Sequence, residues 1–179
     1  EFFNGFRELA NNPESLTART VVRDNAVGMI KNFQDMNRQI DAVQTDLNKN
    51  IESGIGEVNG YIKEIAQLNQ KIQQIEIGGA AANDERDRRD LMVKKLSEKL
   101  DISYAEDKLS GMLNITAGKT GVIVAGTSST ALKTVTNENN QTQIMYELSE
   151  KGTRVDISDQ FKKGSLGGSI ELRDGLVNT

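Results

Sequence analysis

The fold is decided by the stretch from Ser15 to Ile77, SLTARTVVRDNAVGMIKNFQDMNRQIDAVQTDLNKNIESGIGEVNGYIKEIAQLNQKIQQIEI. Its apolar residues recur at steps of three and four, which is the period of one face of an α-helix. The positions are Met29, Phe33, Met36, Ile40, Val43, Leu47, Ile51, Ile55, Val58, Ile62, Ile65, Leu68, Ile72 and Ile75. Polar residues fill the other faces, so the pattern predicts one long amphipathic helix. Unbroken, it would measure about 90 Å at 1.5 Å per residue.

A helix this narrow cannot bury its apolar face against itself, so it needs another long helix from this chain or from a neighbour. We therefore expect an elongated protein whose function is contact with other chains. The predicted fold class is α+β: a long antiparallel helical bundle or coiled-coil rod with a small antiparallel β subdomain. The predicted division is a long-helix domain over 1–101, an antiparallel β unit over 102–157, and a linker with the start of a returning helix over 158–179.

The long helix contains one irregular region. Steps of four follow one another from Val43 to Ile55, a stutter that locally unwinds a left-handed coil. Gly54, Gly56 and Gly60 lie in the same region, and each glycine inside a helix costs about 1 kcal/mol relative to alanine. Two interpretations stay open: a bend or a break into two helices, or small residues that admit the close approach of a partner backbone.

Shorter helices are predicted on both sides of the long one. The apolar spacing of residues 1–10 indicates a helical turn or two, which Pro13 ends, and Ser15 or Thr17 is the expected cap of the long helix. After Gly78-Gly79, Asn83 or Asp84 is expected to cap a second helix over about 85–100. Its predicted buried residues are Leu91, Met92, Leu96 and Leu100, and its predicted i,i+4 ion pairs are Glu85–Arg89, Arg86–Asp90 and Asp90–Lys94.

Residues 102–157 change to short β-prone runs separated by turn residues. We expect five or six antiparallel strands, with a hairpin connection at 107–111 and an exposed loop tip at 137–141. The strand predictions are 102–104, 112–116, 122–124 and 142–148, with 131–135 and 153–157 as weaker ones. Residues 158–169 are polar and glycine-rich and are expected to form a linker, and 170–177 resemble the start of a helix.

Composition excludes several kinds of chemistry. The 179 residues contain no cysteine and no histidine, so disulfides, thiolate catalysis, zinc fingers and histidine acid–base chemistry are absent. The 22 basic and 26 acidic residues are interspersed, which argues against a nucleic-acid partner. No apolar run approaches eighteen residues, so no membrane span is expected. The chain begins Glu1-Phe2-Phe3 and is interpreted as a piece of a longer protein.

Two stretches contain residue types that occur in ligand sites. Ala117-Gly118-Lys119-Thr120 resembles the end of a phosphate-binding loop, but Leu113 occupies the place of the upstream glycine, which favours a β-turn. Asp84, Glu85, Asp87 and Asp90 lack the ligand order of a calcium loop, and the arginines between them favour an ion-paired helix face. We therefore predict no catalytic, cofactor-binding or metal residues, no cofactor, no small-molecule substrate, and no enzyme activity.

Several stretches together resemble one known family, the first flagellar hook-associated protein of bacteria. Phe2-Phe3-Asn4-Gly5-Phe6 through Pro13 resembles the family's "FF-x-x-(F/L)-x-x-L-x-x-N-P" opening. Asn83-Asp84, Asp87-x-Arg89-Asp90, Leu96-Ser97-Glu98 and Leu100-Asp101-Ile102-Ser103 resemble its "ND-x-x-D-x-RD…LSE-x-(V/L)D(V/I)S" segment. Gly164-x-Leu166-Gly167-Gly168-x-Ile170-x-Leu172-Arg173-Asp174 resembles its "G-x-LGG-x-(L/I)-x-(F/L)RD" return. The order is collinear over almost the whole chain.

The resemblance implies a structural protein that joins hook to filament, exported unfolded through the flagellar type III apparatus to the outside of the cell. The implied partners are hook protein, other copies of itself in a ring, and the next hook-associated protein. Two alternatives stay open: another flagellar axial protein such as hook protein or flagellin, or an extracellular receptor-type helical coiled-coil domain. The absence of cysteine is compatible with export of an unfolded chain.

Overall fold

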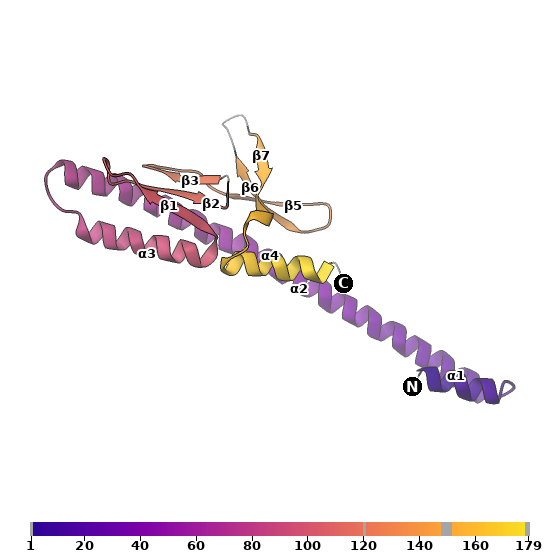
Figure 1. Ribbon diagram of the computed structural model, residues 1–179. Helices are drawn as coiled ribbons and strands as arrows, with labels where there is room; N and C mark the ends of the chain where they lie inside the picture. Colours follow the sequence, from indigo (N-terminus) through magenta and orange to yellow (C-terminus); the bar gives the residue numbers. More distant parts are fainter. Residues whose placement is uncertain (1, 120, 148–151, 178–179) are drawn as a thin grey trace. The chain divides into compact units, whose positions relative to one another are not determined.

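The computed structural model describes residues 2–119, 121–147 and 152–177 (Figure 1). Its helices are α1 (Phe2–Asn11), α2 (Leu16–Ile77), α3 (Asn83–Lys99) and α4 (Gly164–Val177), with a short 3-10 helix η1 (Ser158–Gln160). Its strands are β1 (Ile102–Glu106), β2 (Leu113–Ala117), β3 (Gly121–Ala125), β4 (Ser128–Ser129), β5 (Lys133–Thr136), β6 (Thr142–Glu147) and β7 (Arg154–Asp156). The α+β class and the single long helix are confirmed.

The chain divides into two compact units, residues 1–45 and residues 46–179. In the first unit, α1 packs against the start of α2, where Ala18 and Val22 are buried. A Cβ added at Gly5 would lie 3.3 Å from Val22, so the two helices approach closely. The backbone N–H of Ala18 donates to Ser15 Oγ at 3.2 Å, which confirms Ser15 as the cap of α2.

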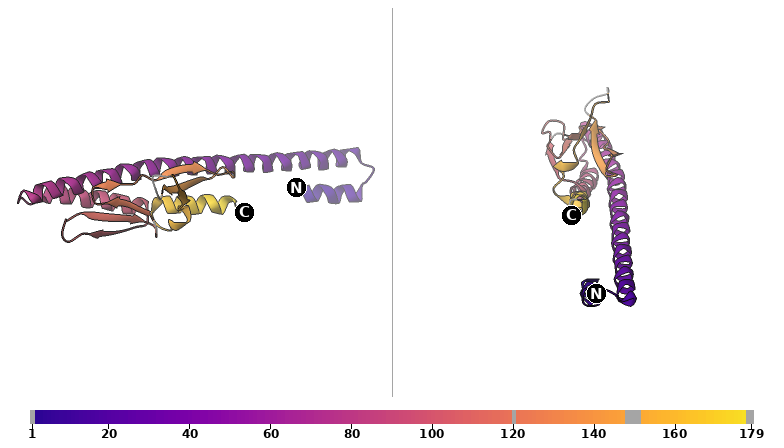
Figure 2. Two further views of the ribbon diagram at one scale, coloured as in Figure 1. Left: turned by 90° about the horizontal axis from the view of Figure 1, so that it is seen from above. Right: turned by 90° about the vertical axis from the view of Figure 1, so that its right-hand side faces the viewer.

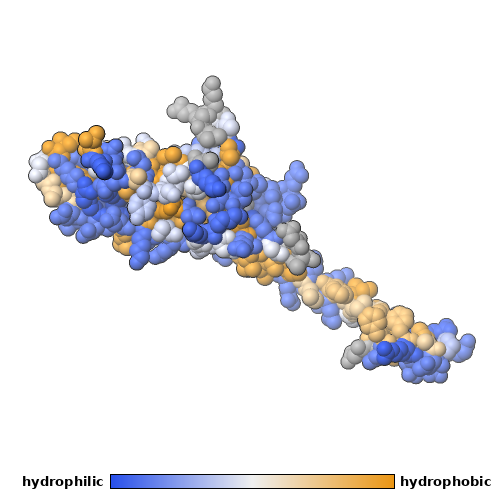
Figure 3. Space-filling model, in the orientation of Figure 1, coloured by the Kyte–Doolittle hydropathy of each residue, from blue (hydrophilic) through white to orange (hydrophobic). Residues whose placement is uncertain are grey.

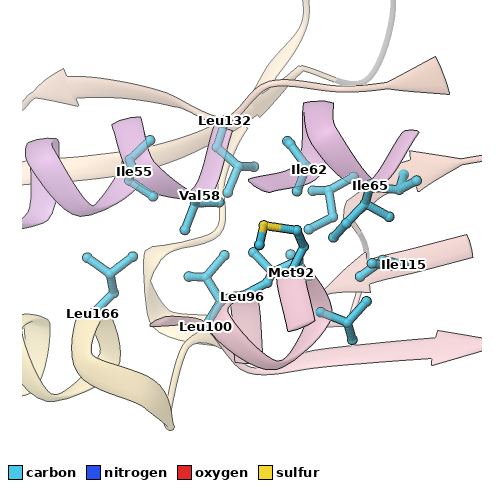
Figure 4. Packing of buried hydrophobic residues seen from close by; sticks show 14 of the residues in the cluster. Ile55, Val58, Ile62, Ile65, Met92, Leu96, Leu100, Ile115, Leu132 and Leu166 are labelled. Atoms are coloured by element: carbon cyan, nitrogen blue, oxygen red, sulfur yellow. The ribbon is translucent and has the colours of Figure 1, made fainter. Parts of the chain in front are cut away.

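The core of the second unit forms between α2, α3, the strands and α4. From Leu47 to Ile72 the apolar face of α2 is buried, and Ile51, Val58 and Ile65 have no exposed surface. Figure 4 shows Ile55 of α2 opposite Leu166 of α4, and Ile62 near Met92 of α3. The prediction that this part of the helix needs other helices to cover it is confirmed within the chain itself.

The strands form two small antiparallel sheets instead of one continuous β unit. The first sheet has the order β1-β2-β3-β4 and the second the order β5-β6-β7. The β1–β2 connection at 107–111 and the β5–β6 turn at 137–141 lie where they were predicted. The sheets separate after β4 because the backbone of Leu132 bonds to the side chain of Asn59 on α2, at 2.9 Å in both directions, and not to another strand. The part of the predicted strand 142–148 at residue 148 lies outside the described residues.

Three predictions about α3 were wrong. Ala82 is its N-cap and makes no side-chain cap hydrogen bond, because the helix already includes Asn83 as its first residue. Leu91 is 49% exposed, because the buried face is centred on Met92, Val93 and Leu96 and takes in Arg89. The arginines of α3 pair with carboxylates on α2 and β1 instead of at i,i+4, because those elements lie alongside.

Helix α4 begins at Gly164, six residues before the predicted start, so 164–169 are helical and not a linker. A Cβ at Gly164 would come within 2.5 Å of the carbonyl oxygen of Lys99, and its φ is +77°, so only glycine suits this contact. The glycines that suggested a linker instead permit close packing. The division into domains over 1–101, 102–157 and 158–179 stays a prediction.

Helix α2 has no break at its glycines. A Cβ at Gly54 would meet Cδ2 of Leu166 at 2.6 Å, whereas one at Gly56 or Gly60 would meet nothing within 4 Å. The close approach at Gly54 therefore admits a leucine side chain of α4, not a partner backbone. Of the interpretations left open, the break into two helices is therefore not found.

Candidate interaction surface

Three asparagines of α2 attach the β strands to the helix. Asn59 donates to the carbonyl of Leu132 and accepts from its N–H, both at 2.9 Å. Asn69 does the same with Leu113, at 2.8 and 3.1 Å, and also donates to the carbonyl of Gly126. In each pair the carboxamide makes the two hydrogen bonds that a neighbouring strand would make to that backbone.

Asn48 acts similarly at the other end of the second unit. It donates to the carbonyl of Asn140 at 2.7 Å and accepts from the N–H of Thr142 at 3.0 Å. The buried guanidinium of Arg173 on α4 bonds the carbonyl of Thr142 and reaches Asn48 at 3.5 Å. The 137–141 turn, predicted as an exposed tip, is thus tied to both α2 and α4.

Sequence reasoning missed these asparagines. A signal was present, since Asn48, Asn59 and Asn69 lie on the same side of α2 as the apolar face and are spaced by about three turns. Asn69 is completely buried, and an amide at that position requires partners.

An ion-pair cluster joins the C-terminal end of α2 to α3 and β1. Arg86 bonds Glu76 at 2.8 and 2.9 Å and Glu106 at 2.6 Å. These hydrogen bonds from Arg86 hold the pKa of Glu76 and of Glu106 below the usual range. Arg89, only 2% exposed, donates to the carbonyl of Gly111 and to Glu106.

The two stretches that contain residue types of ligand sites have other structural roles. Gly118 and Lys119 form the turn between β2 and β3, where the N–H of Lys119 donates to Gln160 at 2.9 Å. Thr120 lies outside the described residues. In the acidic first turn of α3, Glu85 pairs with Lys71 at 2.7 Å. The prediction that the chain holds no catalytic, cofactor or metal residues stays a prediction.

The clearest candidate for a functional site is the apolar face of α2 in the first unit. We call it the α2 surface; it comprises Met29, Phe33, Met36, Ile40 and Val43. These side chains are 37–62% exposed, although they continue the pattern that is buried from Leu47 onward. Figure 3 shows apolar residues along this part of the chain. Isolated exposed apolar residues are ordinary, but a contiguous exposed stripe indicates a binding surface.

The α2 surface carries no charge. At 100° per residue, the four charged residues between 26 and 45 lie on the opposite side of the helix. They are Lys31, Asp35, Arg38 and Asp41. The residues that flank the surface are amides, among them Asn32, Asn37, Gln39 and Gln44. The α2 surface can therefore make apolar contacts with another helix, and the amides at its edges can form hydrogen bonds.

Comparison with known proteins identifies the family of the chain. The family model described as "Flagellar hook-associated protein FlgK helical domain" matches residues 1–179. The chain belongs to this family. Flagellar hook-associated protein 1 of Bacillus subtilis is 28% identical over 183 residues, which cover 95% of this chain and 36% of that protein. The Salmonella typhimurium protein of the same name is 27% identical over 177 residues, 96% of this chain and 32% of that one.

A solved structure supports the fold of the FlgK helical domain. The flagellar hook junction protein FlgK from Burkholderia pseudomallei superimposes with a TM-score of 0.87 at 23% identity, over 96% of this chain and 31% of that one. Figure 2 shows the ribbon of this chain in two further views. The chain spans about a third of the length of the curated relatives it matches. Membership places it in a family of structural, non-enzymatic proteins of the extracellular bacterial flagellum. None of the described helices is long and apolar enough to span a membrane.

Proposed function

We propose that the chain is part of a structural joint between the hook and the filament of the bacterial flagellum. Its partners in this proposal are hook protein, further copies of the same protein in a ring, and the next hook-associated protein. The proposal includes passage through the flagellar export apparatus to the outside of the cell. Family membership supports the flagellar role, and the exposed α2 surface is the observation that supports assembly by helix packing.

The occupant we propose for the α2 surface is an α-helix of a neighbouring axial subunit. Helices take part in covering the same apolar pattern where it is buried: α1 at Ala18 and Val22, and α3 and α4, together with the strands, beyond Leu47. The exposed part covers fifteen residues, about 22 Å of helix. A helix of a neighbouring subunit that packs on the α2 surface would therefore continue the helix packing that the chain already uses.

The lack of charge limits the kind of helix that fits. A buried charge without a partner costs several kcal/mol, so the facing helix must also present apolar and amide side chains. The contact is short, and stable protein–protein interfaces bury roughly 800 Å² on each partner. Such a surface suits an assembly in which several contacts act together, as in a ring of subunits.

Electron microscopy of motile bacteria tests the proposal. Cells that lack the full-length gene are expected to form hooks without attached filaments and to shed flagellin into the medium. The full-length protein carrying Phe33→Asp with Ile40→Asp is expected to leave this defect uncorrected, since it puts two charges on the α2 surface.

The matched control places two charges on the opposite side of the same helix, Gln34→Asp with Ala42→Asp, and is expected to restore filaments. Normal filaments in the deletion strain would refute the junction role. Normal filaments with the Phe33 and Ile40 variant would refute the role of the α2 surface alone.

A further inference from the structure

Among the described residues of the second unit, the most exposed apolar side chain lies at the end of a hairpin. Leu109, between β1 and β2, is 100% exposed. A fully solvated leucine at a projecting turn contributes nothing to the core of this chain. Lys108 precedes it, so the tip presents an apolar group beside a positive charge.

The hairpin tip is held in one conformation by local hydrogen bonds. The carboxylate of Asp107 accepts from the N–H groups of Leu109 at 2.9 Å and Ser110 at 2.8 Å. The N–H of Gly111 donates to the carbonyl of Asp107 at 2.8 Å, and Arg89 holds the carbonyl of Gly111. A rigid tip loses little entropy on binding, which is a property of preorganised contact residues.

The second unit also carries an apolar hollow that could accept a leucine side chain such as Leu109. A shallow apolar depression of about 510 Å³ lies on the outer face of α4, lined by Gly168, Glu171, Leu172, Gly175 and Leu176. Leu172 is 56% exposed, and a Cβ at Gly168 or Gly175 would meet nothing within 4 Å. Figure 3 shows apolar atoms at the surface over α4. Glu171 gives the rim a negative charge.

We propose that Leu109 of one copy inserts into the α4 hollow of a second copy, with Lys108 beside Glu171 at the rim. The inference rests on the proposed function, in which copies are neighbours. It is supported by the match of a projecting apolar side chain to an open apolar hollow, and by the opposite charges beside each.

The contact joins two different surfaces of the same chain, so it is heterologous and continues from copy to copy as a ring or helical array. A single such contact is weak because one leucine buries little area. Repetition around an assembly supplies the stability.

Cysteine cross-linking in the assembled flagellum tests this contact. The chain has no cysteine of its own, so Leu109→Cys with Leu172→Cys in the full-length protein introduces a defined pair. Both sites are exposed, so neither substitution removes a buried side chain from the core. Under mild oxidation of isolated hook–filament preparations, the expected product is a ladder of disulfide-linked dimers, trimers and larger species. The control pair, Val122→Cys with Leu172→Cys, also uses exposed positions and is expected to stay monomeric.

The outcomes separate this inference from the proposed function. Protein present at the hook tip without a ladder would overturn the contact alone, whereas absence of the protein from hook tips would overturn both. A charge exchange gives a second reading: Lys108→Glu and Glu171→Lys are each expected to reduce cross-linking at least threefold, and the double variant to restore it. Failure of restoration would argue against the rim pair and against this orientation of the two copies.

Discussion

Asn69→Leu is expected to destabilise the second unit strongly. The carboxamide of Asn69 makes three hydrogen bonds to the backbone of Leu113 and Gly126, between 2.7 and 3.1 Å. It accepts a fourth from the guanidinium of Arg89 at 3.1 Å. Leucine has a similar volume but removes every partner at once, so two carbonyls, one N–H and a buried cation lose a hydrogen bond.

The magnitude follows from these four bonds. A neutral hydrogen bond contributes about 1 kcal/mol and one to a charged group ~1.5–3 kcal/mol, so the loss is roughly 4–6 kcal/mol. Burial of the leucine side chain returns ~1–2 kcal/mol, which leaves a net destabilisation of about 2–5 kcal/mol. For a chain of this size that corresponds to a fall in Tm on the order of 10 °C.

Thermal and urea unfolding followed by circular dichroism at 222 nm measure this difference. Gln70→Leu is the matched control, because Gln70 is the next residue of α2 and is exposed. That variant is expected to stay within about 0.5 kcal/mol of the unchanged chain. If Asn69→Leu and Gln70→Leu unfold at the same temperature, then α2 does not hold the first sheet through Asn69, and the reasoning about the asparagines fails.

Three further predictions follow from the same contacts. Ile55→Asp with Ile62→Asp introduces two charges into the core and is expected to abolish cooperative unfolding of the second unit by circular dichroism; an unchanged Tm would refute the buried helix contact. Gly56→Ala is expected to raise the free energy of unfolding by about 1 kcal/mol. Gly54→Ala is expected to give no gain, because Leu166 must move to make room for the new methyl group. Equal gains of the two variants in urea unfolding would contradict the close approach at Gly54. The pKa of Glu106 is lowered by Arg86, so its pairing contributes stability above the ordinary glutamate range that is lost as the pH falls through the lowered pKa. Arg86→Gln is therefore expected to flatten the loss of stability between pH 5 and 3, about the range over which such carboxyls titrate, and an unchanged slope would speak against this pair.

The sequence predicted those features that depend on local pattern. The apolar period gave α2 to within a residue at each end, and the β-prone runs gave the positions of most strands. The cap of α2 was narrowed to Ser15 or Thr17 because capping depends on one side chain and the adjacent backbone.

Features that depend on contacts between distant segments were not predictable in the same way. Gly164 and Leu166 suggested a linker because their local composition is glycine-rich, whereas the structure uses them for close packing on Lys99 and Gly54. The separation into two sheets depends on Asn59, which lies 73 residues from the strand segment it binds. No local sequence pattern predicts a hydrogen bond between residues so far apart in the chain.

The candidate surface was predictable only in part. The period marked Met29 to Ile75 as one apolar face, and it also indicated that a partner helix was needed. It did not show that the chain covers the face beyond Leu47 and leaves Met29 to Val43 exposed, because that depends on where α3 and α4 pack.

Thiol labelling of the α2 surface tests the central claim most directly. Met36→Cys on the α2 surface and Ala42→Cys on the opposite side of the helix are compared in the full-length protein, first purified and then within isolated flagella. Both cysteines are expected to react with a maleimide in the purified 179-residue chain, where both positions are exposed, and the same comparison in the purified full-length protein shows whether the rest of that protein covers position 36. On assembly, labelling at position 36 is expected to fall at least tenfold while labelling at position 42 falls much less. Equal labelling at position 36 before and after assembly would contradict the account, because the α2 surface would then face solvent in the finished flagellum.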